Sequence, residues 1–393
     1  MVDYDPFAPA VMDDPQPFYR RLRDEAPACY LPKYDAWALS RFADVWECSS
    51  HPAFSVAKGT TPSQVLTKVQ PVTPMLNLMD PPEHTVLRNR LRDVFMPKPV
   101  ARLEAPARAI ARACLEPALE RGELDVIGDF AGRLSVRITC LSLGLPEGDA
   151  DLLASLVHRF FAREPGVDGM TADGLAAARE LIDYGVALVR ERRAAGHPAQ
   201  DAVDMFCTVE IGGRRLADEE IASHLSMLVI GGSETFPKTF ANAVLRLAEH
   251  PDQRAALASD PSLAPYAYQE SLRYDMPTQF LCRTLTEDVE RHGQRMRAGQ
   301  GVCFLYASAN HDEREFPDPE RFDIQRRARR ILSFGAGTHT CLGLHVARLE
   351  GRVCLEELLA RVPEYHLDLA RAERVRTEFV QGFVSLPIRF PAR

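Results

Sequence analysis

Hydrophobic residues recur at helical spacing through most of the middle of the chain. From about residue 83 to 259, apolar positions return every three or four residues, which predicts a series of amphipathic helices. Residues 28–40 alternate enough between apolar and polar side chains to predict a pair of strands. After residue 277 the pattern changes to short strands and loops, followed by one more helix over 342–360. No repeat or linker separates these regions, so we expect one mainly α domain over 1–393, with a small β portion.

The longest helical stretch covers 218–249 and begins with acidic residues, which are typical of a helix start. Residues 227–230 are apolar on every face, so we expect this helix to be central and buried. Gly231-Gly232 and Pro237 are predicted to interrupt and kink it, because glycine weakens a helix and proline removes a backbone N–H. The kink would leave carbonyl groups unpaired beside a groove.

Charge and cysteine content exclude several classes of protein. The 393 residues carry 47 basic and 55 acidic side chains, a formal net charge of -8, so nothing favours a nucleic-acid partner. The nine cysteines are scattered and form no CxxC pair, which predicts reduced thiols and neither a disulfide framework nor a zinc ribbon. The first residues contain no apolar signal segment, and no apolar run is long enough for a membrane anchor. We therefore expect a cytoplasmic protein.

The segment 334–343 has the features that a buried thiolate ligand requires. Gly335 allows a sharp turn, the helix that follows Cys341 presents its positive end to the sulfur, and Gly343 leaves room for a flat cofactor. Phe334 can pack against the sulfur and exclude water. The alternative is that Cys341 is an ordinary buried cysteine, and a lone cysteine would favour that interpretation.

The pattern FGxGxHxCxG in this segment resembles the iron-ligand loop of the cytochrome P450 family, the haem-thiolate monooxygenases. The resemblance extends over nearly the whole chain and implies the single-domain, triangular cytochrome P450 fold of the bacterial type that lacks a membrane anchor. It implies heme b (iron protoporphyrin IX) as the cofactor and Cys341 as its proximal iron ligand. A thiolate ligand favours O–O bond cleavage, so the expected reaction inserts one oxygen atom from O₂ into a C–H bond.

Two further residue sets match the family. Glu270 and Arg273 lie three apart on a helix, and Arg321 lies in the segment Pro319-Glu320-Arg321-Phe322. The resemblance implies that these three side chains form a buried charged network that supports the cysteine loop. It also implies that the haem propionates are bound by four donors: His84, Arg88, Arg283 and His339. Taken singly, each could instead be an ordinary surface arginine or a satisfied histidine.

Glu234-Thr235 resembles the acid–alcohol pair with which the family activates oxygen. A carboxylate next to a hydroxyl group can relay protons to bound dioxygen. The alternative is a kinked core helix in which a buried threonine caps a free carbonyl. Phe236 departs from the family pattern, in which many members have Thr or Ser, so we expect the groove to differ in shape from theirs.

The resemblance also locates the substrate pocket and the electron donor. The segment 54–79 is mostly apolar, which favours a medium-sized apolar substrate with one or two polar handles, such as a terpenoid, a steroid or an aromatic compound. The expected pocket residues are Val65, Leu66, Val69, Met75, Leu76, Val229, Ile230, Ser233, Gln279, Phe280, Leu281, Phe383 and Val384. Electrons are expected from a ferredoxin and its NAD(P)H-dependent reductase. The candidate residues for a basic docking face are Arg326, Arg327, Arg329, Arg330, Arg348 and Arg352, any of which could equally be a solvated surface charge.

Two other functions remain open at this point. One is a peroxide-driven peroxygenase on the same haem, which the presence of the Glu234-Thr235 pair disfavours. The other is a non-catalytic haem or gas sensor, which the absence of a recognisable output domain disfavours.

Overall fold

A computed structural model describes residues 2–69, 75–164, 170–196, 201–375 and 377–392. Its helices are α1 (Pro9–Asp13), α2 (Gln16–Glu25), α3 (Phe42–Cys48), α4 (Pro62–Val65), α5 (Glu83–Phe95), α6 (Pro97–Val100), α7 (Glu104–Arg121), α8 (Gly132–Leu143), α9 (Ala150–Phe161), α10 (Ala172–Ala195), α11 (Ala202–Thr208), α12 (Asp218–Glu249), α13 (Pro251–Ser259), α14 (Ala264–Tyr274), α15 (Tyr306–Ala309) and α16 (Leu344–Arg361). Its strands are β1 (Ala28–Leu31), β2 (Ala36–Leu39), β3 (Phe54–Ser55), β4 (Glu123–Asp125), β5 (Glu210–Ile211), β6 (Arg214–Arg215), β7 (Leu281–Leu285), β8 (Val289–Arg291), β9 (Gln294–Met296), β10 (Gly301–Phe304), β11 (His366–Leu367), β12 (Glu373–Arg374), β13 (Phe383–Ser385) and β14 (Pro387–Arg389). The predicted mainly α fold with a small β portion is confirmed.

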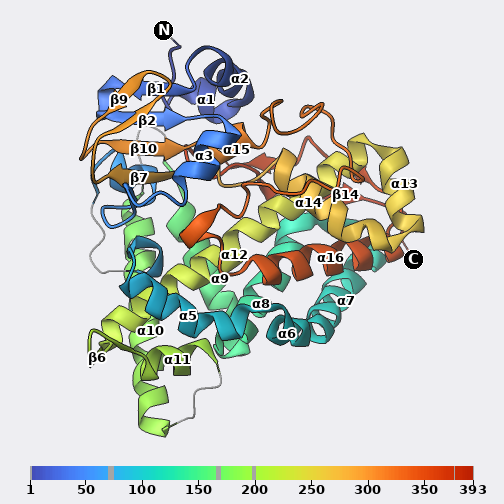
Figure 1. Ribbon diagram of the computed structural model, residues 1–393. Coiled ribbons are helices and arrows are strands. Elements are labelled where there is room, and N and C mark those ends of the chain that lie inside the picture. Colours follow the sequence, from blue (N-terminus) through green and yellow to red (C-terminus); the bar gives the residue numbers. More distant parts are fainter. Residues whose placement is uncertain (1, 70–74, 165–169, 197–200, 376, 393) are drawn as a thin grey trace.

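The largest sheet joins strands from the N-terminal part of the chain to two strands between residues 281 and 304. Its strand order is β1-β2-β10-β7-β3, in which β2 and β10 are parallel and the other neighbours are antiparallel. The predicted strand pair over 28–40 is confirmed as β1 and β2, with Ala28 opposite Leu39. This sheet lies at one side of the molecule, and helices occupy most of the rest (Figure 1).

Helix α12 runs through the centre of the helical part (Figure 1). It packs against α8, α9, α10, α14 and α16, and side chains such as Val229, Phe236 and Phe240 are buried on it. A π-helical turn, Val126–Ala131, precedes α8 and also contacts α12. The predicted central, buried position of this helix is therefore confirmed.

The predicted interruption of this helix is wrong, because α12 continues as an α-helix from Asp218 to Glu249. Two hydroxyl groups satisfy carbonyls that we expected to be unpaired. Ser135 Oγ donates to the carbonyl of Gly232 at 2.7 Å, and Thr235 Oγ1 donates to the carbonyl of Gly231 at 3.1 Å. Proline removes only one backbone donor, and packing on several sides stabilises the remaining turns.

Helices α14 and α16 approach each other closely at Gly351. A Cβ atom at this position would lie 2.2 Å from the ring of Tyr268, which is far inside van der Waals contact. The glycine therefore allows α16, which follows the cysteine loop, to lie directly against α14, which carries Glu270 and Arg273.

Candidate functional site

The loop before α16 holds Cys341 through a tight backbone arrangement. Gly335 and Gly337 adopt φ angles of 66° and 67°, a backbone conformation that residues other than glycine rarely adopt. The backbone N–H of Cys341 donates to the carbonyl of Phe334 at 2.7 Å, which closes the loop. Helix α16 begins at Leu344, so its N-terminal end lies beside the sulfur.

The thiol of Cys341 faces a cavity of about 350 Å³, which we call the Cys341 cavity. Burial raises the pKa of the thiol, whereas the amide of Gly343 and the charge of Arg88 lower it. No atom outside its neighbours lies within 4 Å of where a Cβ of Gly343 would stand. The cavity is therefore open along the backbone at the sulfur, as a flat cofactor would require.

Four cationic or hydrogen-bonding side chains line the same cavity: His84, Arg88, Arg283 and His339. The rings of His84 and His339 lie 4.3 Å apart between centroids, and Arg88 donates to the carbonyl of Thr340. Burial and the charge of Arg88 lower the pKa of His84 to about 4. Burial, with the charges of Arg283, His84 and Arg88, lowers the pKa of His339 to about 3.

Both ring nitrogens of His84 are buried and have no partner among the described residues. Buried polar atoms are nearly always hydrogen-bonded, so the site lacks an acceptor that the holo-protein must supply. A carboxylate can accept from the N–H of the neutral His84 ring and from the neighbouring arginines Arg88 and Arg283, which fits a haem with two propionates.

Glu270 and Arg273 form a buried ion pair on α14. Arg273 Nε donates to Glu270 Oε2 at 2.9 Å, and Nη2 donates to Oε1 at 2.7 Å. Arg273 Nη1 also donates to the carbonyl of Asn310 at 2.9 Å. The pair thus ties α14 to the segment that follows α15.

The predicted role of the Arg321 side chain is wrong. That side chain is 70% exposed, and only the carbonyl of Arg321 reaches Arg273, at 3.4 Å. The second cation on Glu270 is Arg326, whose Nε donates to Oε1 at 3.1 Å. Arg326 is held in turn by the carbonyls of Pro317, Asp318 and Arg321. The loop backbone, which has no periodic pattern, decides which arginine turns inward.

Thr235 and Glu234 lie on different sides of α12. Thr235 lines the Cys341 cavity, together with Leu228, Gly231 and Gly232 from the same helix. Glu234 lines a separate cavity of about 660 Å³, which we call the Glu234 cavity, and forms an ion pair there with Lys238. Burial raises the pKa of Glu234, while Lys238, His158 and Arg163 lower it.

The residues predicted for the substrate pocket fall into three groups. Those that line the Cys341 cavity are Leu76 and Leu281. Those that line the Glu234 cavity are Ser233, Phe383 and Val384. Those that line neither cavity are Val65, Leu66, Val69, Met75, Val229, Ile230, Gln279 and Phe280. The amide of Gln279 is used within the protein, since it bonds Tyr19 and the carbonyl of Met276.

Sequence reasoning missed several residues that line the Cys341 cavity: Thr60, Asn77, Met227, Leu228 and Thr278. Helical spacing could have identified the residues on α12. Leu228 and Gly231 precede Thr235 by seven and four residues, so all three lie on one face of the helix. The positions of Thr60, Asn77 and Thr278 follow no helical period.

The candidate basic residues are largely engaged within the chain. Arg326 pairs with Glu270, Arg330 with Glu315, and Arg352 with Glu104. Arg348 lies over the ring of Phe334, 5.6 Å from its centroid, and is therefore next to the cysteine loop.

Comparisons with known proteins identify the family of the chain. The family model for "Cytochrome P450" matches residues 263–389. The chain is 37% identical to "Putative cytochrome P450 123" of Mycobacterium tuberculosis, over 99% of this chain and 97% of that protein. It is 31% identical to "Methyl-branched lipid omega-hydroxylase" of the same species, over 94% of this chain and 90% of that protein. The crystal structure of CalO2 superposes with a TM-score of 0.88 at 31% identity, and the match covers 100% of both chains.

The fold and the cysteine site are those of a haem-thiolate monooxygenase. The chain belongs to the cytochrome P450 family. It is an oxidoreductase, as the resemblance implied. Within the described segments, no helix combines the length and the apolar character needed to cross a bilayer.

Proposed function

We propose that the cofactor is haem b, bound through Cys341 and through propionate contacts to His84, Arg88, Arg283 and His339. The unpartnered ring nitrogens of His84 are the observation that supports this most directly. Covalent attachment of a c-type haem requires a CxxCH motif, and the sequence contains no CxxC. Phe334, Gly335 and Gly343 surround the sulfur on the side of the loop.

We propose that the enzyme inserts one oxygen atom from O₂ into a C–H bond of an apolar substrate. A bound thiolate-ligated haem supplies dioxygen activation and O–O bond cleavage. Thr235 lines the same cavity as the sulfur, and its hydroxyl oxygen can accept a hydrogen bond there while its hydrogen is donated to the carbonyl of Gly231. Glu234 supplies protons from the other side of α12, where its carboxylate lies beside Lys238.

The proposed substrate is medium-sized and apolar, with one or two polar handles: a terpenoid, a steroid or an aromatic compound. Met227, Leu228 and Leu281 provide apolar walls, and Asn77 and Thr278 provide polar contacts. A relative named as a hydroxylase of methyl-branched lipids is consistent with an apolar substrate.

We propose a ferredoxin with an NAD(P)H-dependent reductase as the electron source, docking beside the cysteine loop near Arg348. Charges at such a surface mainly accelerate encounter with an acidic partner. A cytoplasmic location is consistent with the nine cysteines, all of which are free thiols.

The test is spectroscopic and then catalytic. The reduced protein with carbon monoxide should show the red-shifted Soret band of thiolate ligation, and Cys341→Ala should lose it. A Cys341→Ala protein that keeps this band would refute the proposal. Turnover with NAD(P)H and ferredoxin is expected to exceed turnover with hydrogen peroxide alone, whereas the opposite result would indicate a peroxygenase. Failure to consume NAD(P)H with a broad apolar library would favour a sensor.

A further inference from the structure

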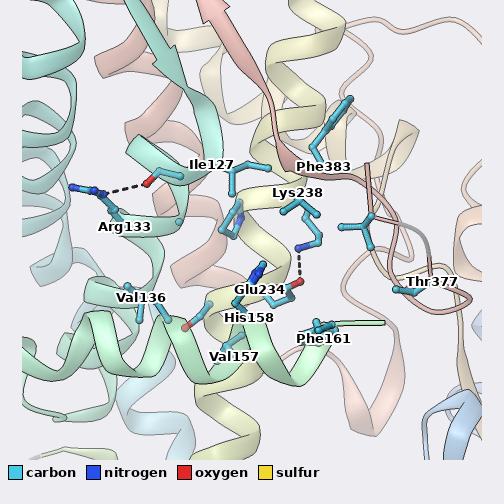
Figure 2. A pocket seen from close by; sticks show the side chains of 18 of the residues that line it. Ile127, Arg133, Val136, Val157, His158, Phe161, Glu234, Lys238, Thr377 and Phe383 are labelled. Carbon is cyan, nitrogen blue, oxygen red and sulfur yellow. Dashed lines mark hydrogen bonds and ion pairs between the residues drawn. The ribbon is translucent and has the colours of Figure 1, made fainter. Parts of the chain in front are cut away.

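The Glu234 cavity lies on the opposite side of α12 from the sulfur. Its volume is about 660 Å³, and it is bounded by the π-helical turn, α8, α9, α12 and the segment around β13 (Figure 2). The described residues that line it include none that line the Cys341 cavity. A molecule bound here would therefore occupy a second site, separated from the first by one helix.

Three side chains that line this cavity retain N–H or O–H donors for which the described residues provide no acceptor. Lys238 is 5% exposed, and its ammonium group, which has three N–H donors, bonds Glu234 as its one acceptor among the described residues. The hydroxyl of Ser233, which is 8% exposed, has no partner in that set. Arg163 Nε is likewise buried without a partner, while its Nη1 donates to backbone carbonyls of its own loop. Unfilled donors of this kind each cost free energy that a bound acceptor would recover.

Positive charge exceeds negative charge around these donors. Glu234 is the carboxylate at the centre, and Figure 2 shows Lys238 and His158 directed toward it. Neither His158 nor Arg163 forms an ion pair with a carboxylate in the part of the chain that the structure describes. Arg374 also lines the cavity and lies over the ring of Phe383, 4.5 Å from its centroid. Two carboxylates, those of Glu234 and Asp151, thus line the cavity together with four basic side chains, Arg133, Arg163, Lys238 and Arg374.

The remaining walls are apolar. Val136 and Val157 line the cavity from α8 and α9, and Phe161 and Phe383 line it from the end of α9 and from β13. An inorganic anion would leave these surfaces without contact. A multiply charged anion would also be repelled by Glu234. The walls and the charges together select a singly charged group on a hydrocarbon tail.

We propose that the Glu234 cavity binds an amphipathic monocarboxylate, such as a medium-chain fatty acid. Its carboxylate accepts hydrogen bonds from Lys238, Ser233 and Arg163, and its tail packs against Val157, Phe161 and Phe383. This site is separate from the substrate cavity and does not depend on the proposed reaction.

The experiment uses the holoenzyme with phenylimidazole coordinated to the iron, so that the Cys341 cavity is filled. Isothermal titration calorimetry with decanoate should then show one binding event. Decanol, which has the same tail and no charge, should bind at least about tenfold more weakly, because a charge-assisted hydrogen bond is lost. No decanoate binding, or equal affinity for decanol, would overturn the proposal.

Substitutions test the location. Arg163→Gln should weaken decanoate binding about tenfold and leave decanol binding nearly unchanged. Ala154→Phe fills the cavity and should weaken both ligands, whereas Ser155→Phe, on the exposed neighbouring position, should weaken neither. Unaltered decanoate affinity in Arg163→Gln, or in an Ala154→Phe protein with an intact carbon monoxide band, would show that the binding occurs elsewhere. If Ala154→Phe does not fold, Arg163→Gln decides the question alone.

Discussion

Glu234 and Thr235 are consecutive in α12, yet their side chains open onto different cavities. Successive residues of an α-helix point about 100° apart, so one turn of this helix exposes the acid to one side and the alcohol to the other. If both residues serve proton delivery, the proton has to pass from one side of the helix to the other.

Thr235→Ala should uncouple electron consumption from product formation. Thr235 is the residue of α12 next to Glu234, and its side chain lines the Cys341 cavity. The alanine variant removes its hydroxyl from that cavity. Product formed per NAD(P)H should fall about tenfold, with hydrogen peroxide released instead. Thr235→Ser, which keeps the hydroxyl, is the matched control and should retain most of the coupling. Unchanged coupling in the alanine variant would refute the relay role.

Lys238→Met should destabilise the protein by about 3 kcal/mol, because it leaves the buried carboxylate of Glu234 without its cation. Adding Glu234→Gln should restore part of this loss, since the double variant no longer buries an unpaired charge. Chemical denaturation of the wild type, both single variants and the double variant measures the coupling. Strictly additive effects would contradict the ion pair.

Arg326 and Arg321 should differ sharply in their effect on stability. Arg326→Ala removes the second cation from buried Glu270 and should cost about 2 kcal/mol. Arg321→Ala removes an exposed side chain and should change the free energy of unfolding by less than about 0.5 kcal/mol. Thermal unfolding of the two holo-variants is the measurement, and the reverse ranking would restore the role first assigned to Arg321.

His224 should make stability depend on pH below neutrality. Burial lowers its pKa to about 4, and its ring stacks on Phe206 at 5.2 Å. Between the unfolded value of about 6.5 and about 4, the unfolded chain binds a proton that the folded protein does not. Stability should therefore fall as pH falls through this window, by about 3 kcal/mol in total. His224→Phe should remove this contribution, so between pH 7 and pH 4 the difference in unfolding free energy should shift by about 3 kcal/mol in favour of the variant; a difference that does not change with pH would contradict it.

The sequence predicted best what is local. Two features depend only on residues close together in the sequence: the loop from Phe334 to Gly343 and the Glu270–Arg273 pair. Such local features do not require knowledge of how distant segments pack. The start and end of α12 also followed from local patterns, whereas its continuity did not, because the hydroxyl of Ser135 comes from another helix.

The assignment of side chains to cavities was less predictable. The family resemblance predicts Val229 and Ile230 as pocket residues, but the face of α12 that holds Thr235 carries Leu228 and Gly231 instead. Helical spacing alone would have corrected this choice. No spacing rule would have separated Ser233 and Phe383 from the Cys341 cavity, since that division depends on how α9 and β13 pack on the far side of α12.

The close contact between Gly351 and Tyr268 constrains the position of Cys341, the proposed iron ligand. The ring of Tyr268 occupies the space that a methyl group at residue 351 would need. Even an alanine there would therefore push α14 and α16 apart. Because Cys341 directly precedes α16, this separation would move its sulfur relative to the side chains that line the Cys341 cavity. Residue 351 thus influences the cysteine loop through the spacing of two helices, although it does not belong to the loop itself.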